Sequence, residues 1–361
     1  MLSGSMLLPP SKSHAMRWLV LAGMDSEPTS ITMREIGKDV QAMIDCLRIL
    51  GIDYDSGIVK GGVFSPQSNS LDCKNSGTAL RFLIAQVSTM DGKYLMDGDS
   101  SLQVRSSLPL LKSLGIEYEF TSENHLPVLL SGPMTNEKLT IDNSMSSQFL
   151  SAILLMTPRT NGFELVTIGD SVSRKHSDLT WELCKATGAR EMGVPWKVSC
   201  PDVIIPPDPS MAAFCKLAGL DIENPPNSSD LIGHDLEKLD LRDSNDLITP
   251  LSAILALGDG GQITGAKHAT YKESNRILRT RDLLEQFSIK SEITDDGLII
   301  EGGQVPKEPV ELVRTYGDHR IQMTAVILAS MCSGVVEGSN LHEVAWPSFI
   351  EQLESCGLIL N

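Results

Sequence analysis

Basic and hydroxyl side chains lie directly before an apolar segment near the start of the chain. Lys12, Ser13 and Arg17 lead into the apolar run 18–23, and Pro9 and Pro10 come before them. Proline cannot lie in a helix interior and serine caps helix starts, so the sequence predicts a helix that begins here. Backbone N–H groups, hydroxyls and two cations at one helix start can hold an anion. On its own, this motif is more often a capped, solvated helix start.

The same arrangement of polar residues before an apolar run occurs five more times. These polar stretches begin at residues 75, 144, 208, 244 and 317. Successive starts are about 64 to 73 residues apart, except for one interval of about 36, which indicates internal repeats.

Each repeat is predicted to contain strand, helix, strand, helix, strand and strand. The second helices are predicted at 39–50, 103–114, 178–187, 273–286 and 347–355, and glycine follows several of them. The short interval indicates that the fourth repeat has lost about half of its length, so that only 235–239 remain of its second part. Six repeats divide into two domains of three, and Pro206 and Pro207 mark a crossing between them.

Several residues at these helix starts could bind an anion in the first half of the chain. Gly77 lies between two hydroxyl residues, where a ligand can approach the backbone closely. Arg105 is predicted at the start of a helix, where the helix dipole disfavours a cation, so it needs an anionic partner. Ser146, Ser147 and Gln148 are three neutral hydrogen-bonding side chains that suit a phosphate or sugar-like hydroxyls, or serve only as caps.

Two interpretations stay open in this half. Asp39 is either an ordinary first-turn carboxylate or a residue that reaches the ligand site. The loop 171–176, which contains Ser173, is either an anion-binding loop or a solvated one.

The second half contains the most concentrated ionic residues. Lys272 and Arg276 are four residues apart, so they are predicted to share one helical face and to attract an anion. Asp246 is a carboxylate at a helix start, one repeat earlier. The sixth helix start adds an acid, an imidazole and a guanidinium, in Asp318, His319 and Arg320.

Composition excludes several classes of protein. The 361 residues carry 30 basic and 46 acidic side chains, a formal charge of −16, which argues against a nucleic-acid surface. We expect no membrane span and no signal peptide, and therefore a cytoplasmic protein. The seven cysteines are scattered without a Cys-x-x-Cys pair, so buried free thiols are expected rather than disulfides or a zinc site.

Together these motifs resemble the enolpyruvyl transferase family, in particular its branch that acts on shikimate 3-phosphate. The resemblance covers nearly the whole chain and rests on 11–17, 75–81, 146–148, 272–276 and 318–320. It implies an α/β (α+β) fold of two inverse α/β barrel-like domains, built from six βαβαββ repeats with the fourth abbreviated. It places the domains at 11–204 and at 1–10 with 205–361, with helix N-termini facing a cleft.

The resemblance also implies a reaction and the residues that perform it. The enolpyruvyl group of phosphoenolpyruvate moves to the 5-hydroxyl of shikimate 3-phosphate and phosphate leaves, in a monomer without metal or cofactor. Shikimate 3-phosphate is held by Ser13, Arg17, Ser146, Ser147, Ser173, Lys272 and His268. Phosphoenolpyruvate is held by Lys12, Gly77, Arg105, Gln148, Arg276 and Arg320. Proton transfers fall to Lys12, Asp246, Glu273 and His319.

The chain departs from the family pattern near its C-terminus. The family has a lysine three residues before the proline of a Trp-Pro or Phe-Pro pair, and Val344 stands there in this chain, ahead of Trp346 and Pro347. One alternative is therefore a non-catalytic protein that binds shikimate 3-phosphate. Another is the sister enzyme acting on UDP-N-acetylglucosamine, but the loop 97–102 lacks the cysteine that is usual in that enzyme.

Overall fold

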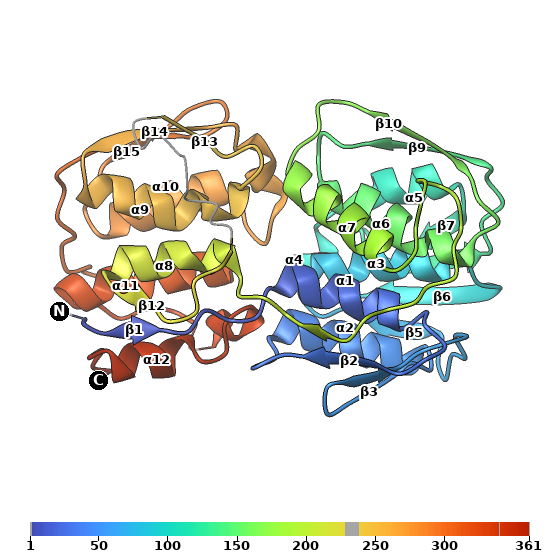
Figure 1. Ribbon diagram of the computed structural model, residues 1–361. Coiled ribbons are helices and arrows are strands. Elements are labelled where there is room, and N and C mark those ends of the chain that lie inside the picture. The colour runs from blue at the N-terminus through green and yellow to red at the C-terminus, as the bar shows by residue number, and fades with distance from the viewer. Residues whose placement is uncertain (1, 228–237, 339, 361) are drawn as a thin grey trace. The chain divides into compact units, whose positions relative to one another are not determined.

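The computed structural model describes residues 2–227, 238–338 and 340–360. The chain forms two compact units (Figure 1). Unit 1 comprises Met1–Ser11 and Pro206–Asn361, and unit 2 comprises Lys12–Ile205. Each unit has a hydrophobic core of its own.

Three buried helices form the centre of unit 2. They are α1 (Lys12–Ala22), α3 (Gly77–Val87) and α6 (Ser147–Met156), and each of them contacts the other two. Nearly every residue of α3 and α6 is buried, which explains why these segments are apolar on almost all sides. Around them pack α2 (Lys38–Ile49), α5 (Leu108–Leu114) and α7 (Arg174–Ala186).

The strands of unit 2 form three sheets. One has the order β5-β6-β8-β7, a second β11-β2-β4-β3, and the third pairs β9 with β10. In the first two, the initial pair is parallel and the other two pairs are antiparallel. Their bounds are β2 (Thr29–Thr32), β3 (Asp53–Asp55), β4 (Ile58–Lys60), β5 (Ser70–Asp72), β6 (Gly92–Asp97), β7 (Glu117–Phe120), β8 (Val128–Gly132), β9 (Lys138–Asp142), β10 (Glu164–Ile168) and β11 (Val203–Ile204).

Unit 1 repeats this plan with fewer elements. Its central helices are α8 (Ala212–Ala218), α9 (Ile248–Leu257) and α11 (His319–Cys332), which contact one another, and α10 (Arg276–Gln286) packs on α9 and α11. The sheet order is β13-β14-β16-β15, from β13 (Lys238–Asp240), β14 (Gly260–Thr264), β15 (Ser291–Ile293) and β16 (Leu298–Glu301). The last helix is α12 (Phe349–Ser355), and β1 (Ser5–Met6) pairs in parallel with β12 (Asp221–Ile222).

The predicted order of strand, helix, strand, helix, strand and strand occurs from β1 to β4, from β5 to β8 and from β13 to β16, with α4 and α5 together in the place of the second helix between β6 and β7. The stretches β5 to β8 and β13 to β16 also share their sheet order. In the fourth repeat only fifteen residues, 223–237, separate β12 from β13. Of the predicted remnant 235–239, residues 235–237 lie outside the described residues, and 238 and 239 belong to β13.

Several predicted helices have different bounds in the structure: the helix predicted at 178–187 begins at Arg174 and the one predicted at 347–355 begins at Phe349. Two further differences change the position of charged residues. The segment 103–114 is divided into α4 (Ser100–Gln103) and α5, so Arg105 lies in the turn between two helices rather than at a helix start. The helix predicted from 273 begins at Arg276, with Asn275 as its cap. Lys272 is in extended backbone before it, so Lys272 and Arg276 do not share a helical face.

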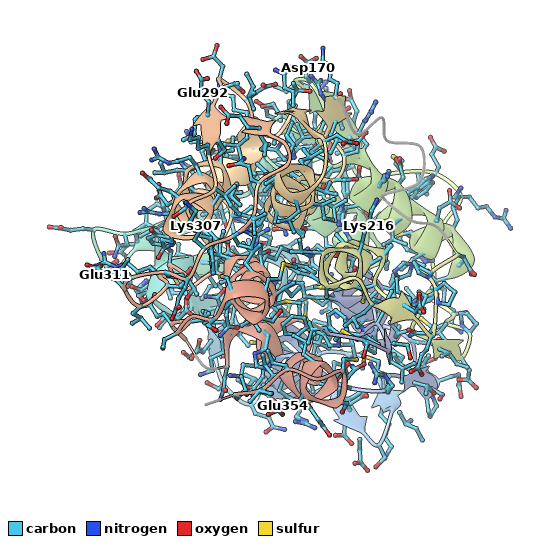
Figure 2. All side chains as sticks on the ribbon, turned by 90° about the vertical axis from the view of Figure 1, so that its left-hand side faces the viewer. Asp170, Lys216, Glu292, Lys307, Glu311 and Glu354 are labelled. Carbon is cyan, nitrogen blue, oxygen red and sulfur yellow. The ribbon has the colours of Figure 1, made fainter. Side chains whose placement is uncertain are left out.

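The polar surface and the thiols match the composition. Figure 2 shows exposed charged side chains such as Lys307, Glu311 and Glu354 standing out from unit 1. All seven cysteines are free, and five of them are buried. Among the described residues, none of the helices combines the length and the apolar character needed to cross a membrane.

Candidate functional site

Lys12 and Asp39 form an ion pair where α1 and α2 begin. Lys12 Nζ lies 2.7 Å from Asp39 Oδ2, and the two side chains are 20% and 6% exposed. The buried carboxylate holds the ammonium charged and directed, while the lysine still reaches solvent. Asp39 therefore contacts a predicted site residue in addition to occupying the first turn of α2.

Arg17 is a buried cation held by neutral groups. Its Nε donates to Thr180 Oγ1 at 2.6 Å, Nη1 donates to Ser13 O at 2.8 Å, and Nη2 donates to His176 O at 3.0 Å. Its guanidinium carbon also lies 5.3 Å from the centre of the Phe82 ring. Burial lowers the pKa of Arg17, because water no longer stabilises its charge. Among the described residues no carboxylate pairs with it, so a bound anion would supply the missing countercharge.

Gly77 opens α3 beneath two guanidinium groups. A Cβ at this position would lie 2.9 Å from Arg81 Nη1 and 3.3 Å from Arg105 Nη1. Arg105 Nη2 in turn donates to Asn75 O at 2.6 Å, just before the helix. The absence of a side chain at Gly77 thus lets two cations approach a helix N-terminus, whose first N–H groups have no partner within the helix.

Gln148 connects the first turns of α6 and α3. Its Nε2 donates to Thr78 Oγ1 at 3.0 Å, and its Oε1 accepts a hydrogen bond from Arg81 Nη1. The amide therefore lies beside the guanidinium pair at Gly77. Because Arg81 fixes the oxygen, the NH2 end keeps a second hydrogen for another acceptor.

The four serines predicted to bind shikimate 3-phosphate lie at three helix starts of unit 2, with Ser13 in the first turn of α1. Ser146 caps α6 by accepting from Gln148 N at 3.2 Å, and Ser147 is the first residue of that helix. Ser173 precedes α7, is 6% exposed, and has φ 50°, in the left-handed region. A buried residue other than glycine in this region is strained, which is common at ligand sites.

In unit 1, Arg276 is surrounded by three carboxylates, and we name these four residues the Arg276 cluster. Its Nε lies 2.8 Å from Asp318 Oδ2, Nη1 lies 2.6 Å from Asp246 Oδ1, and Nη2 lies 2.9 Å from Glu273 Oε2. Although burial opposes the charge, these three anions raise the pKa of Arg276. The anion that the sequence predicted for Lys272 and Arg276 is thus provided by Asp246, which also lies 3.4 Å from Lys272 Nζ.

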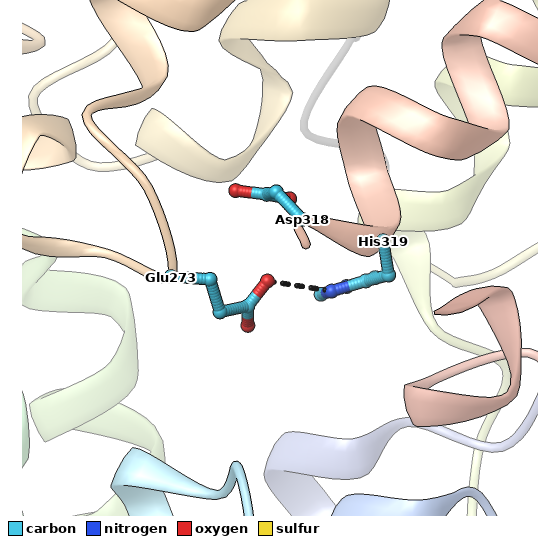
Figure 3. A group of neighbouring side chains, drawn as sticks. All are labelled: Glu273, Asp318 and His319. Atoms are coloured by element: carbon cyan, nitrogen blue, oxygen red, sulfur yellow. Dashed lines mark hydrogen bonds and ion pairs between the residues drawn. The ribbon is translucent and has the colours of Figure 1, made fainter. Parts of the chain in front are cut away.

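Glu273 and His319 form an acid–base pair beside this cluster. His319 Nδ1 and Glu273 Oε2 are 2.7 Å apart, and the two side chains face each other (Figure 3). His319 Nε2 is buried and has no hydrogen-bond partner among the described residues. Because an ionised carboxylate only accepts, Nδ1 carries a proton when Glu273 is ionised, and the imidazolium form of His319 can pass that proton to Glu273.

Three side chains of this region could in principle bind a metal ion. Glu273, Asp318 and His319 offer ligand atoms within 4.8 Å of one another. The Arg276 guanidinium, however, already contacts both carboxylates, at 2.9 Å and 2.8 Å. A divalent cation would lie against this positive charge, so the arrangement fits ion pairing and proton transfer better than metal binding.

The remaining predicted residues of unit 1 lie close to Asp246. Arg320 Nη1 donates to Asp246 O at 3.1 Å, and Arg320 Nη2 donates to Ser210 Oγ at 2.8 Å. Arg320 is 4% exposed and has no carboxylate partner among the described residues. Burial lowers the pKa of Lys272, and burial together with Lys272 lowers the pKa of His268 to about 4, so His268 is neutral at neutral pH.

Within each unit, the structure brings most of the predicted residues together at the starts of the central helices. Val344, at the position of the missing lysine, ends the 3-10 helix η5 (Leu341–Val344), and the next turn is held by Trp346, whose ring lies 5.3 Å from that of Phe349. Arg81 and Asp318 stand within the motifs 75–81 and 318–320, but the sequence predicts no role for them in binding or proton transfer. Only the fold reveals their partners, Gln148 and Arg276.

Comparisons with known proteins agree with this geometry. Residues 1–224 and 197–353 match the family described as EPSP synthase (3-phosphoshikimate 1-carboxyvinyltransferase). A 3-phosphoshikimate 1-carboxyvinyltransferase from Korarchaeum cryptofilum is 29% identical, over 98% of this chain and 96% of its own length. One from Methanocorpusculum labreanum is 28% identical, over 99% and 96%. The Korarchaeum alignment spans 411 positions and this chain has 361 residues, so at least 50 of those positions are absent from this chain.

Solved structures share the fold. EPSP synthase from Acinetobacter baumannii has a TM-score of 0.75 and 23% identity, over 99% of this chain and 96% of that one. The enolpyruvyl transferase NikO from Streptomyces tendae has a TM-score of 0.70 and 16% identity, over 99% and 95%. These similarities confirm the predicted fold class.

Proposed function

The chain belongs to the EPSP synthase family, and on this premise we propose that it transfers the enolpyruvyl group of phosphoenolpyruvate to the 5-hydroxyl of shikimate 3-phosphate. The observation that carries the proposal is the set of buried guanidinium groups without a carboxylate partner among the described residues: Arg17, Arg81 and Arg320. A chain of net charge −16 has many acids that could neutralise them. Buried cations left unpaired in such a chain support a ligand with several negative charges, as both substrates have.

The reaction consists of an addition followed by an elimination. The 5-hydroxyl oxygen bonds to C2 of phosphoenolpyruvate, the hydroxyl proton goes to a base, and C3 receives a proton from an acid. The C2–O bond to phosphate then breaks, C3 loses a proton, and inorganic phosphate leaves. The chemistry requires one group that accepts protons and one that donates them, each within hydrogen-bond reach of the substrate.

The two units contain groups suited to these steps. Asp246 is proposed to accept the hydroxyl proton, because it is a partly exposed carboxylate. Lys12 is proposed to assist by stabilising the hydroxyl oxygen as its proton leaves, because its ammonium is a donor that still reaches solvent beside Asp39. Glu273 is proposed to protonate C3, and the imidazolium form of His319, whose Nδ1 is 2.7 Å away, is proposed to return a proton to Glu273 and become neutral imidazole. The guanidinium groups of Arg276 and Arg320 are proposed to bind the carboxylate of phosphoenolpyruvate, with Asp246 and Glu273 giving up their contacts to Arg276.

We further propose that the protein works as a monomer in the cytoplasm. The negative net charge supports the absence of a nucleic-acid partner. The proposed steps need only proton transfers and ion pairs, so they require no metal or organic cofactor.

One observation favours a second candidate function. Val344 replaces a cation that the family uses on phosphoenolpyruvate, so a protein that binds shikimate 3-phosphate without turnover is the alternative. The phosphate-binding groups of unit 2 would be retained in such a protein.

Phosphate release separates the two functions. The assay measures release with both substrates together and with each alone, in the wild type, in Glu273→Gln, and in Glu285→Gln, an exposed residue on α10 that serves as a matched control. The transferase predicts release that needs both substrates, is lost in Glu273→Gln, and is retained in Glu285→Gln. No release from the wild type, alongside calorimetric binding of shikimate 3-phosphate, would instead establish the binding protein.

A further inference from the structure

Arg81 is a buried cation that has not been assigned to either substrate. It lies in the second turn of α3 and is 7% exposed. Its Nη1 donates to Gln148 Oε1, its Nη2 lies 3.4 Å from Ser106 O, and its Nε is buried without a hydrogen-bond partner among the described residues. The Phe149 ring lies 5.4 Å from the guanidinium carbon. These neighbours are neutral, so within the described part of the chain the charge of Arg81 is stabilised by dipoles and an aromatic face.

A second cation, Arg105, further raises the free energy of the charged Arg81 side chain. Arg105 approaches the same first turn of α3, and a Cβ on Gly77 would contact one Nη1 atom of each arginine, at 2.9 Å and 3.3 Å. Burial, and after it the charge of Arg105, lowers the pKa of Arg81. Neither guanidinium pairs with a carboxylate of the described residues, so their mutual repulsion raises the free energy of the empty site, and a doubly charged anion would offset it.

The hydrogen bond from Arg81 fixes the orientation of the Gln148 amide. The two ends of a glutamine amide have nearly the same shape and opposite hydrogen-bonding character. Arg81 can bond only the oxygen, so it fixes the amide with the NH2 group on the side of Thr78, where Nε2 donates at 3.0 Å. Without Arg81 the amide is free to turn and to present its oxygen to an anion, which is repulsive.

We propose that Arg81 is a positioning residue for phosphoenolpyruvate: it orients Gln148 so that the amide donates to the phosphoryl group, and with Arg105 it supplies a second positive charge at the start of α3. This inference rests on the proposed function and adds to it a residue outside the set predicted to touch either substrate. Its consequence is specific to one substrate, because shikimate 3-phosphate is assigned to other residues of unit 2.

The test compares Arg81→Met and Arg81→Lys with Arg159→Met. Arg159 is a matched control in the same unit, since its guanidinium also stacks on an aromatic ring, 3.7 Å from the centre of Phe64, and bonds a threonine, Thr89. Steady-state phosphate release gives kcat and the KM of each substrate. Circular dichroism confirms that each variant is folded, and Arg81→Lys, which keeps the charge in the core, replaces Arg81→Met if that variant fails to fold.

We expect the KM for phosphoenolpyruvate to rise about 10- to 100-fold in Arg81→Met, the range of a lost charge-assisted hydrogen bond, while the KM for shikimate 3-phosphate changes less than about twofold. Arg81→Lys keeps the positive charge but loses the planar guanidinium with its several N–H donors, so its KM for phosphoenolpyruvate should lie between those of the wild type and Arg81→Met. Because Arg81 acts through Gln148, Gln148→Ala should raise the KM for phosphoenolpyruvate much less in the Arg81→Met background than it does in the wild type.

Three outcomes would overturn the inference. They are an unchanged KM for phosphoenolpyruvate in Arg81→Met, an equal loss for both substrates, and full additivity with Gln148→Ala. All three are measured against an active wild type, so they leave the proposed function standing. If the wild type binds but does not turn over, calorimetric titration of phosphoenolpyruvate in the presence of shikimate 3-phosphate gives the same comparison. A wild type that neither binds nor turns over phosphoenolpyruvate would refute the proposed function, and this inference with it.

Discussion

Asp318→Asn tests how the Arg276 cluster is stabilised. Asp318 is fully buried, contacts Arg276 at 2.8 Å, and caps α11 by accepting from Arg320 N at 2.9 Å. Removing one partner of a buried ion pair costs about 3–5 kcal/mol. Asparagine keeps the cap, and Asp246 and Glu273 still neutralise Arg276, so we expect the free energy of unfolding of unit 1 to fall by the lower amount of about 2–3 kcal/mol.

Hydrogen exchange measured by mass spectrometry reports this loss in each unit separately. A loss of about 2–3 kcal/mol corresponds to about 30- to 150-fold faster exchange in the most protected amides of α11, where exchange follows unfolding of the unit. The amides of α3, in unit 2, should be unchanged. The matched control is Asp282→Asn, which removes a more exposed pair with Arg279 and should change exchange by less than about threefold. Equal effects of the two substitutions on α11, or an equal effect on α3, would refute the reasoning.

Three other changes follow from the geometry. Arg320→Ala removes a buried cation and should weaken phosphoenolpyruvate binding by about 2–5 kcal/mol in calorimetry, whereas equal loss of shikimate 3-phosphate binding would contradict the assignment. Gly77→Ala places a Cβ 2.9 Å from Arg81 Nη1 and 3.3 Å from Arg105 Nη1, so steady-state kinetics should show at least about a tenfold higher KM for phosphoenolpyruvate, and an unchanged KM would show that both arginines can move away. Burial lowers the pKa of His268 to about 4, below its value of about 6.5 in an unfolded chain, so protonation favours unfolding. The free energy of unfolding present above pH 6.5 should therefore fall by up to about 3 kcal/mol as the pH drops towards 4. Urea titrations of the wild type and His268→Asn measure this, and an identical pH dependence of the two would refute it.

The starts of the central helices were predictable because caps are local. Ser76, Ser146 and Asp318 each accept a hydrogen bond from a backbone N–H two or three residues later, so the signal lies within a few positions of sequence. Anion-binding groups placed at those starts were found for the same reason. The βαβαββ order was predictable as well, and it occurs in β1–β4, β5–β8 and β13–β16.

The errors arose where a weaker local signal was overlooked. Pro109 cannot lie in a helix interior but is tolerated in the first turn, and α5 indeed begins one residue before it. This signal would have placed Arg105 outside the helix. In the same way Asn275, a favourable cap, places Glu273 in the loop before α10.

The pairing of charges could not be read from the sequence at all. Asp318 is 42 residues from Arg276, and Gln148 is 67 residues from Arg81. Such contacts depend on how the central helices pack on one another. For this reason the spacing of Lys272 and Arg276 predicted that they attract a bound anion, whereas in the fold the carboxylate of Asp246 contacts both of them.

The first residues of the chain complete the core of unit 1. β1 pairs with β12, Met6 and Leu8 are buried among the residues of this core, and Ser3 N donates to Cys356 O at 2.9 Å. During translation, Lys12–Ile205 leaves the ribosome before the rest of unit 1 exists, and domains generally fold as units in order of synthesis. Unit 2 can therefore fold before the partners of residues 1–11 have been synthesised. Unit 1 can complete its fold only after the residues around Cys356 have been synthesised, so it folds late in translation or after it.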